Sequence, residues 1–247
     1  MKILAVDVGN SEVKRVSIDD GAIGIVQRNA TRDIDNFVDE IAKQDLPVVL
    51  CSVRSAVTSR IKEALARENK ELNYEITDAN ANPVSGFYKG IGGDRIAEVS
   101  AAWLEFGGNR PVAVIGLGTA TTISAASSEG EFKGGFITLG LGAVCSTLSN
   151  ALPELPTIDP REARSLEPAF DTYSNLCRGA VAAHVGIVKE WISLFKKDLG
   201  DDLAVLATGG WSEFVSARCD CFDKVDPLLT LKGIWAVYKA SNRPQGG

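Results

Sequence analysis

Three short glycine-containing segments each follow an apolar run that has the length of a buried strand. They are Asp7-Val8-Gly9-Asn10-Ser11, Gly116-Leu117-Gly118-Thr119 and Thr208-Gly209-Gly210. Glycine allows backbone N–H groups to approach phosphate oxygens closely, and the amides of a turn form a concave site for an anion. A carboxylate at the end of a strand can hold Mg²⁺ directly or through water. The three segments together predict nucleotide binding, with Asp7 as the candidate magnesium ligand.

A fourth segment, Gly92-Gly93-Asp94-Arg95, precedes apolar residues at helical spacing, which include Ile96, Val99 and Trp103. Two interpretations of Asp94 stay open at this point. It could cap the N-terminus of that helix. Alternatively, it could act as a general base at the floor of a pocket, with Arg95 balancing its charge.

The first two glycine segments predict an internal repeat. Shifting the chain by 109 residues places Gly118 on Gly9 and Gly116 on Asp7. Each segment stands between an apolar run and a second, alternating run, which indicates strand, tight turn and strand. We therefore predict two lobes, 1–109 and 110–247, that hold a nucleotide between them.

The elements that position these segments alternate between strand and helix. Helical spacing is found around Ile34–Ile41, Ile96–Phe106 and Ala180–Leu194, whereas buried strands are predicted at 3–6, 13–18, 48–53, 74–77, 112–115, 121–124 and 203–207. This alternation is typical of an α/β fold with largely buried sheets.

Composition excludes several classes of protein. The 247 residues carry a net charge of -6, which disfavours non-specific nucleic-acid binding. No apolar run is long enough for a transmembrane helix, and the N-terminus lacks a signal-peptide pattern, so we expect a cytoplasmic protein with no membrane partner. Five cysteines, an odd number, favour reduced thiols, and the single histidine, His184, has the spacing of a packed helix residue.

The order of these motifs along the chain resembles that of the type III pantothenate kinases, which belong to the acetate kinase–sugar kinase–Hsp70–actin superfamily. The segment 7–11 is similar to the family's first phosphate motif, and Gly92-Gly93-Asp94-Arg95 is similar to its Gly-x-Asp-Arg motif. Gly118-Thr119-Ala120 resembles the second phosphate motif. Further matches are Gly134-Gly135-Phe136-Ile137, Thr172, Gly179, Thr208-Gly209-Gly210 and Asp226-Pro227-Leu228.

The resemblance implies two repeated ribonuclease-H-like or actin-like lobes with mixed sheets flanked by helices. It also implies ATP-dependent phosphorylation of pantothenate, the first step toward coenzyme A, with Mg²⁺, a K⁺ or NH₄⁺ ion and a homodimer. Asp94 would take the proton of the pantothenate hydroxyl. The residues expected at the phosphates are Asp7, Gly9, Asn10, Ser11, Lys14, Gly118, Thr119, Gly209 and Gly210, and those expected at the substrate are Gly92, Gly93, Arg95 and Thr172.

One position departs from the family pattern. The second phosphate motif normally begins with aspartate, and here that position is Gly116. Loss of a carboxylate removes a hard oxygen ligand for a cation. Two alternatives follow: a related kinase with another hydroxyl acceptor, or a nucleotide- or ligand-binding protein with little or no turnover.

Overall fold

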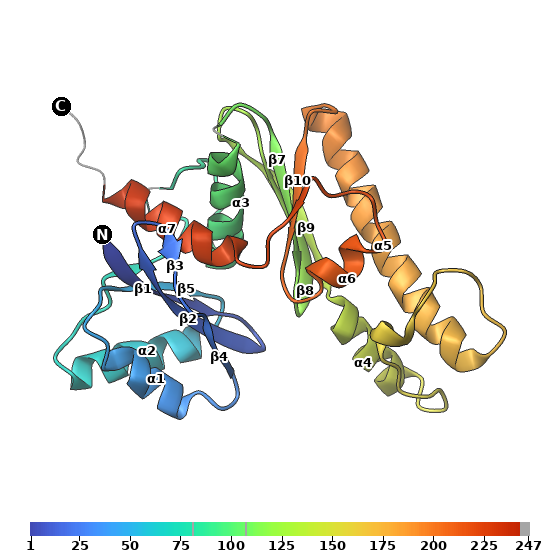
Figure 1. The fold of residues 1–247 in the computed structure, drawn as a ribbon, viewed down its shortest axis with the longest axis horizontal. Helices are drawn as coiled ribbons and strands as arrows, with labels where there is room; N and C mark the ends of the chain where they lie inside the picture. Colours follow the sequence, from blue (N-terminus) through green and yellow to red (C-terminus); the bar gives the residue numbers. More distant parts are fainter. Residues whose placement is uncertain (81, 107, 243–247) are drawn as a thin grey trace. The chain divides into compact units, whose positions relative to one another are not determined.

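A computed structural model of the chain describes residues 1–80, 82–106 and 108–242. They form two compact units (Figure 1). The first contains the described residues of Met1–Gly107, Gly130–Phe132 and Leu228–Gly247, and the second contains Gly108–Glu129 and Lys133–Pro227. The C-terminal segment was predicted to belong to the second lobe, but the structure packs it in the first unit.

The first unit is a mixed sheet with helices on both faces (Figure 1). Its strand order is β3-β2-β1-β5-β6, with β4 paired to β2. The strands are β1 (Lys2–Val8), β2 (Glu12–Asp19), β3 (Ala22–Ile23), β4 (Gln27–Ala30), β5 (Val48–Ser52) and β6 (Tyr74–Glu75). The helices are α1 (Asp35–Ala42), α2 (Ser55–Arg67), α3 (Gly93–Glu105) and α7 (Leu229–Ser241).

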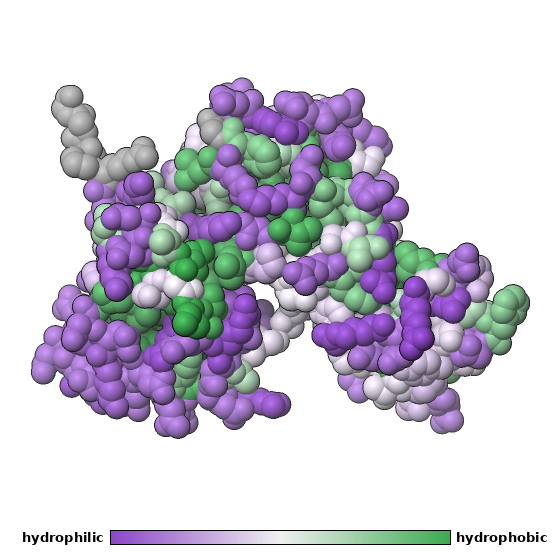
Figure 2. Space-filling view, viewed as in Figure 1, coloured by the Kyte–Doolittle hydropathy of each residue, from purple (hydrophilic) through white to green (hydrophobic). Residues whose placement is uncertain are grey.

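Amphipathic spacing explains the layers of this unit. Phe37 and Ile41 of α1 and Ile61 and Leu65 of α2 join the buried side chains of β1 and β5 in one core. The outward surface over α1 and α2 is mainly hydrophilic (Figure 2). Helices α3 and α7 contact β5 as well, and α7 also contacts β1.

The second unit has the strand order β11-β10-β7-β8-β9. Its strands are β7 (Val112–Leu117), β8 (Ala120–Ala126), β9 (Phe132–Leu139, whose first residue belongs to the first unit), β10 (Ala204–Thr208) and β11 (Lys224–Val225). Its helices are α4 (Leu141–Ala151), the 3-10 turn η1 (Pro160–Glu162), α5 (Thr172–Leu199) and α6 (Ser212–Ser216). Side chains of α4, α5 and α6 share one core with β7, β8 and β10.

The predicted repeat is confirmed by the topology of the two sheets. In the first unit β1 is antiparallel to β2 and parallel to β5, which is parallel to β6. In the second unit β7 is antiparallel to β8 and parallel to β10, which is parallel to β11. Asp7 and Gly116 occupy equivalent places: Asp7 lies opposite Lys14, and Gly116 lies opposite Thr122. The two-lobed α/β fold is therefore as predicted.

The cysteines differ in part from the prediction. Cys219 and Cys221, which follow α6, are joined by a disulfide, so the expectation of reduced thiols was wrong for this pair. Their Cα atoms lie 5.3 Å apart, within the span that a disulfide bridges. Cys51, Cys145 and Cys177 are free and buried. None of the helices in the described ranges combines the length and apolar character that crossing a bilayer requires.

Close backbone contact joins α7 to α3. Gly233 of α7 lies so near the carbonyl oxygen of Ala97 in α3 that a Cβ atom at position 233 would collide with it. The obstacle is backbone, which cannot move aside by changing rotamer. The absence of a side chain at Gly233 therefore fixes the C-terminal helix in the first unit.

We predict that Gly233→Ala destabilises the protein by about 1–3 kcal/mol because it overpacks this contact. Gly186→Ala is the matched control: position 186 is an exposed site inside α5, with nothing within 4 Å of the added methyl group. It should stabilise the protein by up to about 1 kcal/mol through helix propensity. Urea unfolding of both variants measures the two effects, and equal changes would contradict the role of the α3–α7 contact.

Candidate active site

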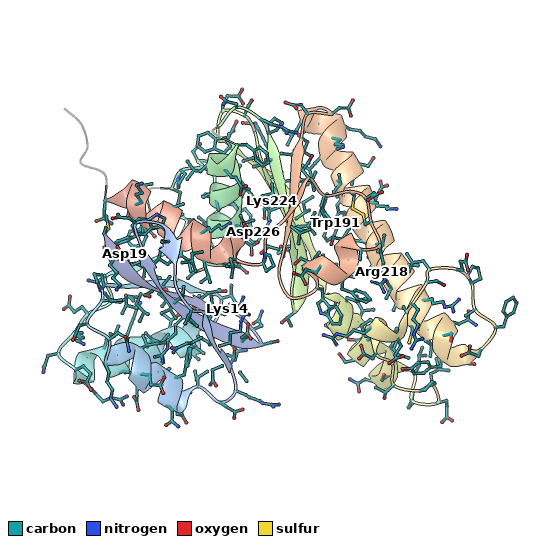
Figure 3. The ribbon with its side chains drawn as sticks, in the orientation of Figure 1. Lys14, Asp19, Trp191, Arg218, Lys224 and Asp226 are labelled. Carbon is teal, nitrogen blue, oxygen red and sulfur yellow. A yellow bond between two sulfur atoms is a disulfide. The ribbon has the colours of Figure 1, made fainter. Side chains whose placement is uncertain are left out.

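A buried carboxylate stands near the end of β1. Asp7 is 7% exposed, and its Oδ2 atom lies 3.3 Å from Nζ of Lys14, its cross-strand neighbour on β2 (Figure 3 labels Lys14). Burial raises the pKa of Asp7, and the charge of Lys14 opposes that rise. The antiparallel register of β1 and β2 thus places one carboxylate and one ammonium beside the first glycine turn.

Hydrogen bonds within the turn and from Thr31 stabilise the turn between β1 and β2. The Gly9 N–H donates a hydrogen bond to the Glu12 carbonyl at 2.9 Å, which closes the turn. Thr31, just after β4, donates its hydroxyl to the Gly9 carbonyl at 3.1 Å and its N–H to the Ser11 carbonyl at 3.0 Å. Asn10 and Ser11 are exposed at the tip of this turn.

Asp94 is the second residue of α3, and not its cap. The helix starts at Gly93, with Gly92 at the N-cap position, so the capping interpretation was wrong. The Asp94 Oδ1 atom accepts a hydrogen bond from the Arg95 N–H at 2.8 Å, and it lies where a side chain at position 92 would have to be. Burial raises the pKa of Asp94, while the Arg95 N–H and guanidinium oppose the rise. Asp94 is therefore a half-buried carboxylate in the first turn of α3.

Arg95 is an anchor within the first unit. It is buried, its Nη1 atom donates to the Tyr88 hydroxyl at 2.7 Å, and its guanidinium lies 5.9 Å from the ring centroids of Tyr88 and Phe132. These contacts hold the start of α3 against the segment that precedes it.

Sequence reasoning missed Glu98, which lies one helical turn after Asp94. Glu98 is buried and accepts a hydrogen bond from the Thr230 hydroxyl of α7 at 2.9 Å. Burial, followed by the negative charge of Asp94, raises the pKa of Glu98 to about 8. The available signal was a glutamate within an otherwise apolar stretch, four residues after the candidate base.

The second unit brings its two glycine segments together. The Gly118 N–H donates to the Ala120 carbonyl at 3.0 Å, and Thr119 is exposed at the tip of this turn. Gly209, with φ +94°, sits against the Leu117 carbonyl, which also accepts a hydrogen bond from the Trp211 N–H at 3.0 Å. The turns at Gly118–Thr119 and Gly209–Gly210 are therefore neighbours.

Position 116 lies inside β7, where Gly116 pairs with Thr122 on one side and Thr208 on the other. Within the described part of the chain, the buried Thr208 hydroxyl has no hydrogen-bond partner. The equivalent pairing in the first unit joins Asp7 to Cys51. The two units thus share the same backbone pairing at this position, but only the first has a carboxylate there.

Two further residues have defined places in the second unit. Thr172, a predicted substrate residue, is the exposed first residue of α5. His184 is buried and lies 2.9 Å from the Thr121 hydroxyl through Nε2, as expected for a packed histidine. Burial lowers the pKa of His184.

Comparison with known proteins decides the family. The family model described as "Type III pantothenate kinase" matches residues 3–194, which include Asp7, Asp94 and Gly118. The chain belongs to the type III pantothenate kinase family. A type III pantothenate kinase of Moorella thermoacetica is 28% identical over 96% of this chain and 98% of its own length.

Solved structures support the fold alone. Component A of the (R)-2-hydroxyglutaryl-CoA dehydratase of Acidaminococcus fermentans matches with a TM-score of 0.57 and 15% identity, over 98% of this chain and 100% of that one. The activator of the 2-hydroxyisocaproyl-CoA dehydratase of Clostridium difficile, solved with bound ADPNP, matches with a TM-score of 0.52 and 14% identity. It covers 97% of this chain and 96% of its own.

Membership of this kinase family supports a phosphotransferase that uses ATP with a divalent cation. The first unit suits such a cation at Asp7. Mg²⁺ usually keeps several waters and binds one or two carboxylates together with substrate phosphates. Among the residues that the structure describes, no group of three or more His, Cys, Asp and Glu side chains could form a metal cage. The single buried carboxylate of Asp7, beside the first glycine turn, is chemically suited to that mode of binding.

The Asp7–Lys14 pair generates a prediction about stability and pH. Lys14→Met leaves the Asp7 carboxylate buried without its cation, which should cost about 2–3 kcal/mol at neutral pH. A carboxyl whose pKa is raised by folding contributes stability at low pH that is lost as the pH rises through that pKa. The variant raises the pKa of Asp7 further, so its destabilisation should be larger near pH 7 than near pH 4. Urea unfolding in metal-free buffer measures this, and an equal loss at both pH values would contradict the pairing.

Proposed function

We propose that this protein transfers the γ-phosphoryl group of ATP to the primary hydroxyl of pantothenate, the first step toward coenzyme A. The observation that carries the proposal is Asp94, a half-buried carboxylate inside the family's Gly-x-Asp-Arg motif at the start of α3. Phosphoryl transfer needs positioning and charge neutralisation more than covalent chemistry. A cytoplasmic location, where ATP is available, belongs to the same proposal.

Each group has a separate task in this proposal. Asp94 takes the proton of the acceptor hydroxyl, and Gly92, Gly93, Arg95 and Thr172 contribute to the acceptor site. Turn residues bind phosphate oxygens through backbone amides and hydroxyls: Gly9, Asn10 and Ser11 in the first unit, and Gly118, Thr119, Gly209 and Gly210 in the second. Asp7 holds Mg²⁺, which neutralises phosphate charge when bound, and Lys14 approaches the oxygens of the transferred group.

Release of ADP from saturating ATP and Mg²⁺, measured with and without pantothenate, tests the proposal. Pantothenate-dependent ADP release is expected. ADP release that depends on another hydroxyl compound, and not on pantothenate, would indicate a related kinase with a different acceptor. Nucleotide binding without ADP release would indicate a binding protein. Gly116 is the observation that favours the last alternative, because it removes one carboxylate from the second phosphate motif.

We predict that Asp94→Asn lowers turnover by about 10²–10⁴-fold, because it removes the general base. The substitution keeps the side-chain shape, so the circular dichroism spectrum and unfolding midpoint should stay close to those of the wild type. Asp19→Asn, at the exposed end of β2, is the control for loss of one carboxylate in the same unit. A folded Asp94→Asn protein with wild-type turnover would refute the assignment of the base.

A monovalent cation, K⁺ or NH₄⁺, is also part of the proposal, and Gly116 makes it testable. Gly116 is paired on both sides within β7, and extended backbone accepts any L-residue without the strain of positive φ. We predict that Gly116→Asp raises turnover and lowers the Mg²⁺ and K⁺ concentrations needed for half-maximal rate, because hard cations need oxygen ligands. Identical cation titrations and rates for the two proteins would show that position 116 does not serve a cation.

A homodimer completes the proposal. β9 is an edge strand that exposes Phe136, Ile137 and Leu139, and the Phe136 ring lies 5.5 Å from that of Trp191 on α5. An apolar edge of this kind is commonly covered by another chain. A second copy of this protein is the occupant that the family resemblance suggests, and sedimentation equilibrium reports the mass directly.

A further inference from the structure

Glu98 lies on the same face of α3 as Asp94, because residues four apart are neighbours on a helix surface. It is 9% exposed, and Ala97 and Val99 beside it are fully buried. The proposed mechanism gives this carboxyl group no task. A buried carboxyl next to a catalytic one is nevertheless bound to influence its charge.

The C-terminal helix closes over Glu98. The Thr230 hydroxyl, in the first turn of α7, donates to Glu98 Oε1 at 2.9 Å. One turn further along, Gly233 brings the α7 backbone against Ala97, the residue that precedes Glu98. Helix α7 therefore supplies a neutral hydrogen-bond donor and excludes water from the carboxyl group.

The charged and titratable groups that face Glu98 come from four elements. They are Asp94 on α3, Asp7 on β1, Lys14 on β2 and the Cys51 thiol on β5. Lys14 is paired with Asp7, and Asp94 has the Arg95 N–H and guanidinium. The hydrogen bond to Glu98 comes from a neutral hydroxyl.

Neighbouring buried carboxyl groups cannot all ionise without a large electrostatic cost, so one of them retains a proton. Asp7 and Asp94 each have a cationic neighbour that favours the ionised form. The proton is therefore expected on Glu98. The direction of its shift agrees, since burial and the Asp94 charge raise the pKa of Glu98 to about 8.

We propose that Glu98 is a positioning residue for Asp94: it keeps its proton at neutral pH, so that Asp94 carries the negative charge on this face of α3. The proposal rests on the proposed role of Asp94 as the base. An ionised Glu98 would raise the pKa of Asp94 and lead it to hold a proton, whereas a neutral Glu98 leaves Asp94 free to accept one. Thr230 orients the neutral carboxyl group.

The first test measures protonation without reference to activity. Glu98→Gln is an uncharged mimic of the protonated side chain. A folded-state pKa of about 8, against about 4.3 in the unfolded chain, means that the wild type loses stability as the pH rises between these values. The urea midpoint of Glu98→Gln minus that of the wild type should therefore grow from about pH 5 to about pH 8 and then stay constant.

Glu63→Gln, at an exposed position of α2 in the same unit, is the matched control for loss of a carboxylate. Its midpoint difference should stay level over the same range. A level difference for Glu98→Gln as well would mean that Glu98 is already ionised, and it would overturn the proposal.

A second measurement covers the case in which Glu98→Gln does not fold. Infrared titration of the wild-type protein should show a protonated carboxyl band that disappears with a midpoint near pH 8. The nearly isosteric Thr230→Val variant removes a hydrogen bond that lowers the pKa of Glu98, so the midpoint should move to higher pH. Absence of any protonated carboxyl band near pH 7 would overturn the proposal.

Kinetics then test the connection to Asp94. If Glu98 is neutral, Glu98→Gln should leave the acidic limb of the pH–rate profile where it lies in the wild type. If Glu98 is ionised, the substitution removes a neighbouring negative charge, and the acidic limb should shift to lower pH. A shift of that kind refutes the proposal. Absence of pantothenate-dependent ADP release in the wild type would refute the proposed function instead, and the unfolding and infrared results would still report on Glu98.

Discussion

Burial of negative charge is the constraint on which the first unit depends. Asp7, Asp94 and Glu98 interact electrostatically inside one small unit, and water cannot stabilise their charges fully. The fold answers with specific partners: Lys14 across the hairpin for Asp7, the first turn of α3 for Asp94, and a neutral hydroxyl from α7 for Glu98. Each partner comes from a different element, so the arrangement exists only when β2, α3 and α7 are all packed.

The two units show what this constraint does to a repeated fold. Apart from β4, the two sheets have the same strand order, and both units carry a tight turn after the first strand of the repeat. Only the first unit keeps a carboxylate before that turn, and only there does a lysine stand opposite. In the second unit, Gly116 lies opposite Thr122, and among the described residues the neighbouring buried Thr208 hydroxyl finds no hydrogen-bond partner. Backbone topology has therefore been retained where the side-chain chemistry has diverged.

Much of the fold could be predicted from the sequence, because apolar periodicity and glycine turns are local signals. The strands predicted at 3–6 and 112–115 are present but extend through Asp7 and Gly116, and the helix predicted from Ile96 begins at Gly93. The place of α7 could not be predicted, because it depends on the contact between Gly233 and Ala97, which are far apart in the sequence. The Cys219–Cys221 disulfide was missed because cysteine counting is only a statement about composition.

The motifs of the candidate site could be predicted from the sequence, whereas the contacts between distant residues could not. Asp7 stands out because it lies two residues before Gly9, and Asp94 because it directly follows Gly93. Glu98 looks like an ordinary helix residue until α7 covers it. Its partner, Thr230, lies 132 residues away, so no local pattern links the two. The missed residues are therefore those whose chemistry is created by tertiary contact.

The hydrogen bond between Thr230 and Glu98 depends on where α7 lies in the chain. The chain leaves the second unit at Pro227 and enters the first unit at Leu228, immediately before α7 begins. Thr230 is in the first turn of that helix, so the segment that returns from the second unit reaches Glu98 almost at once. Glu98 in turn is one helical turn from Asp94. A displacement at the start of α7 would have two opposing effects on Glu98: loss of the Thr230 hydrogen bond would raise its pKa, whereas entry of water would lower it. The protonation of Glu98 therefore depends on the packing of α7, through burial and the Thr230 hydrogen bond, as well as on the charge of Asp94.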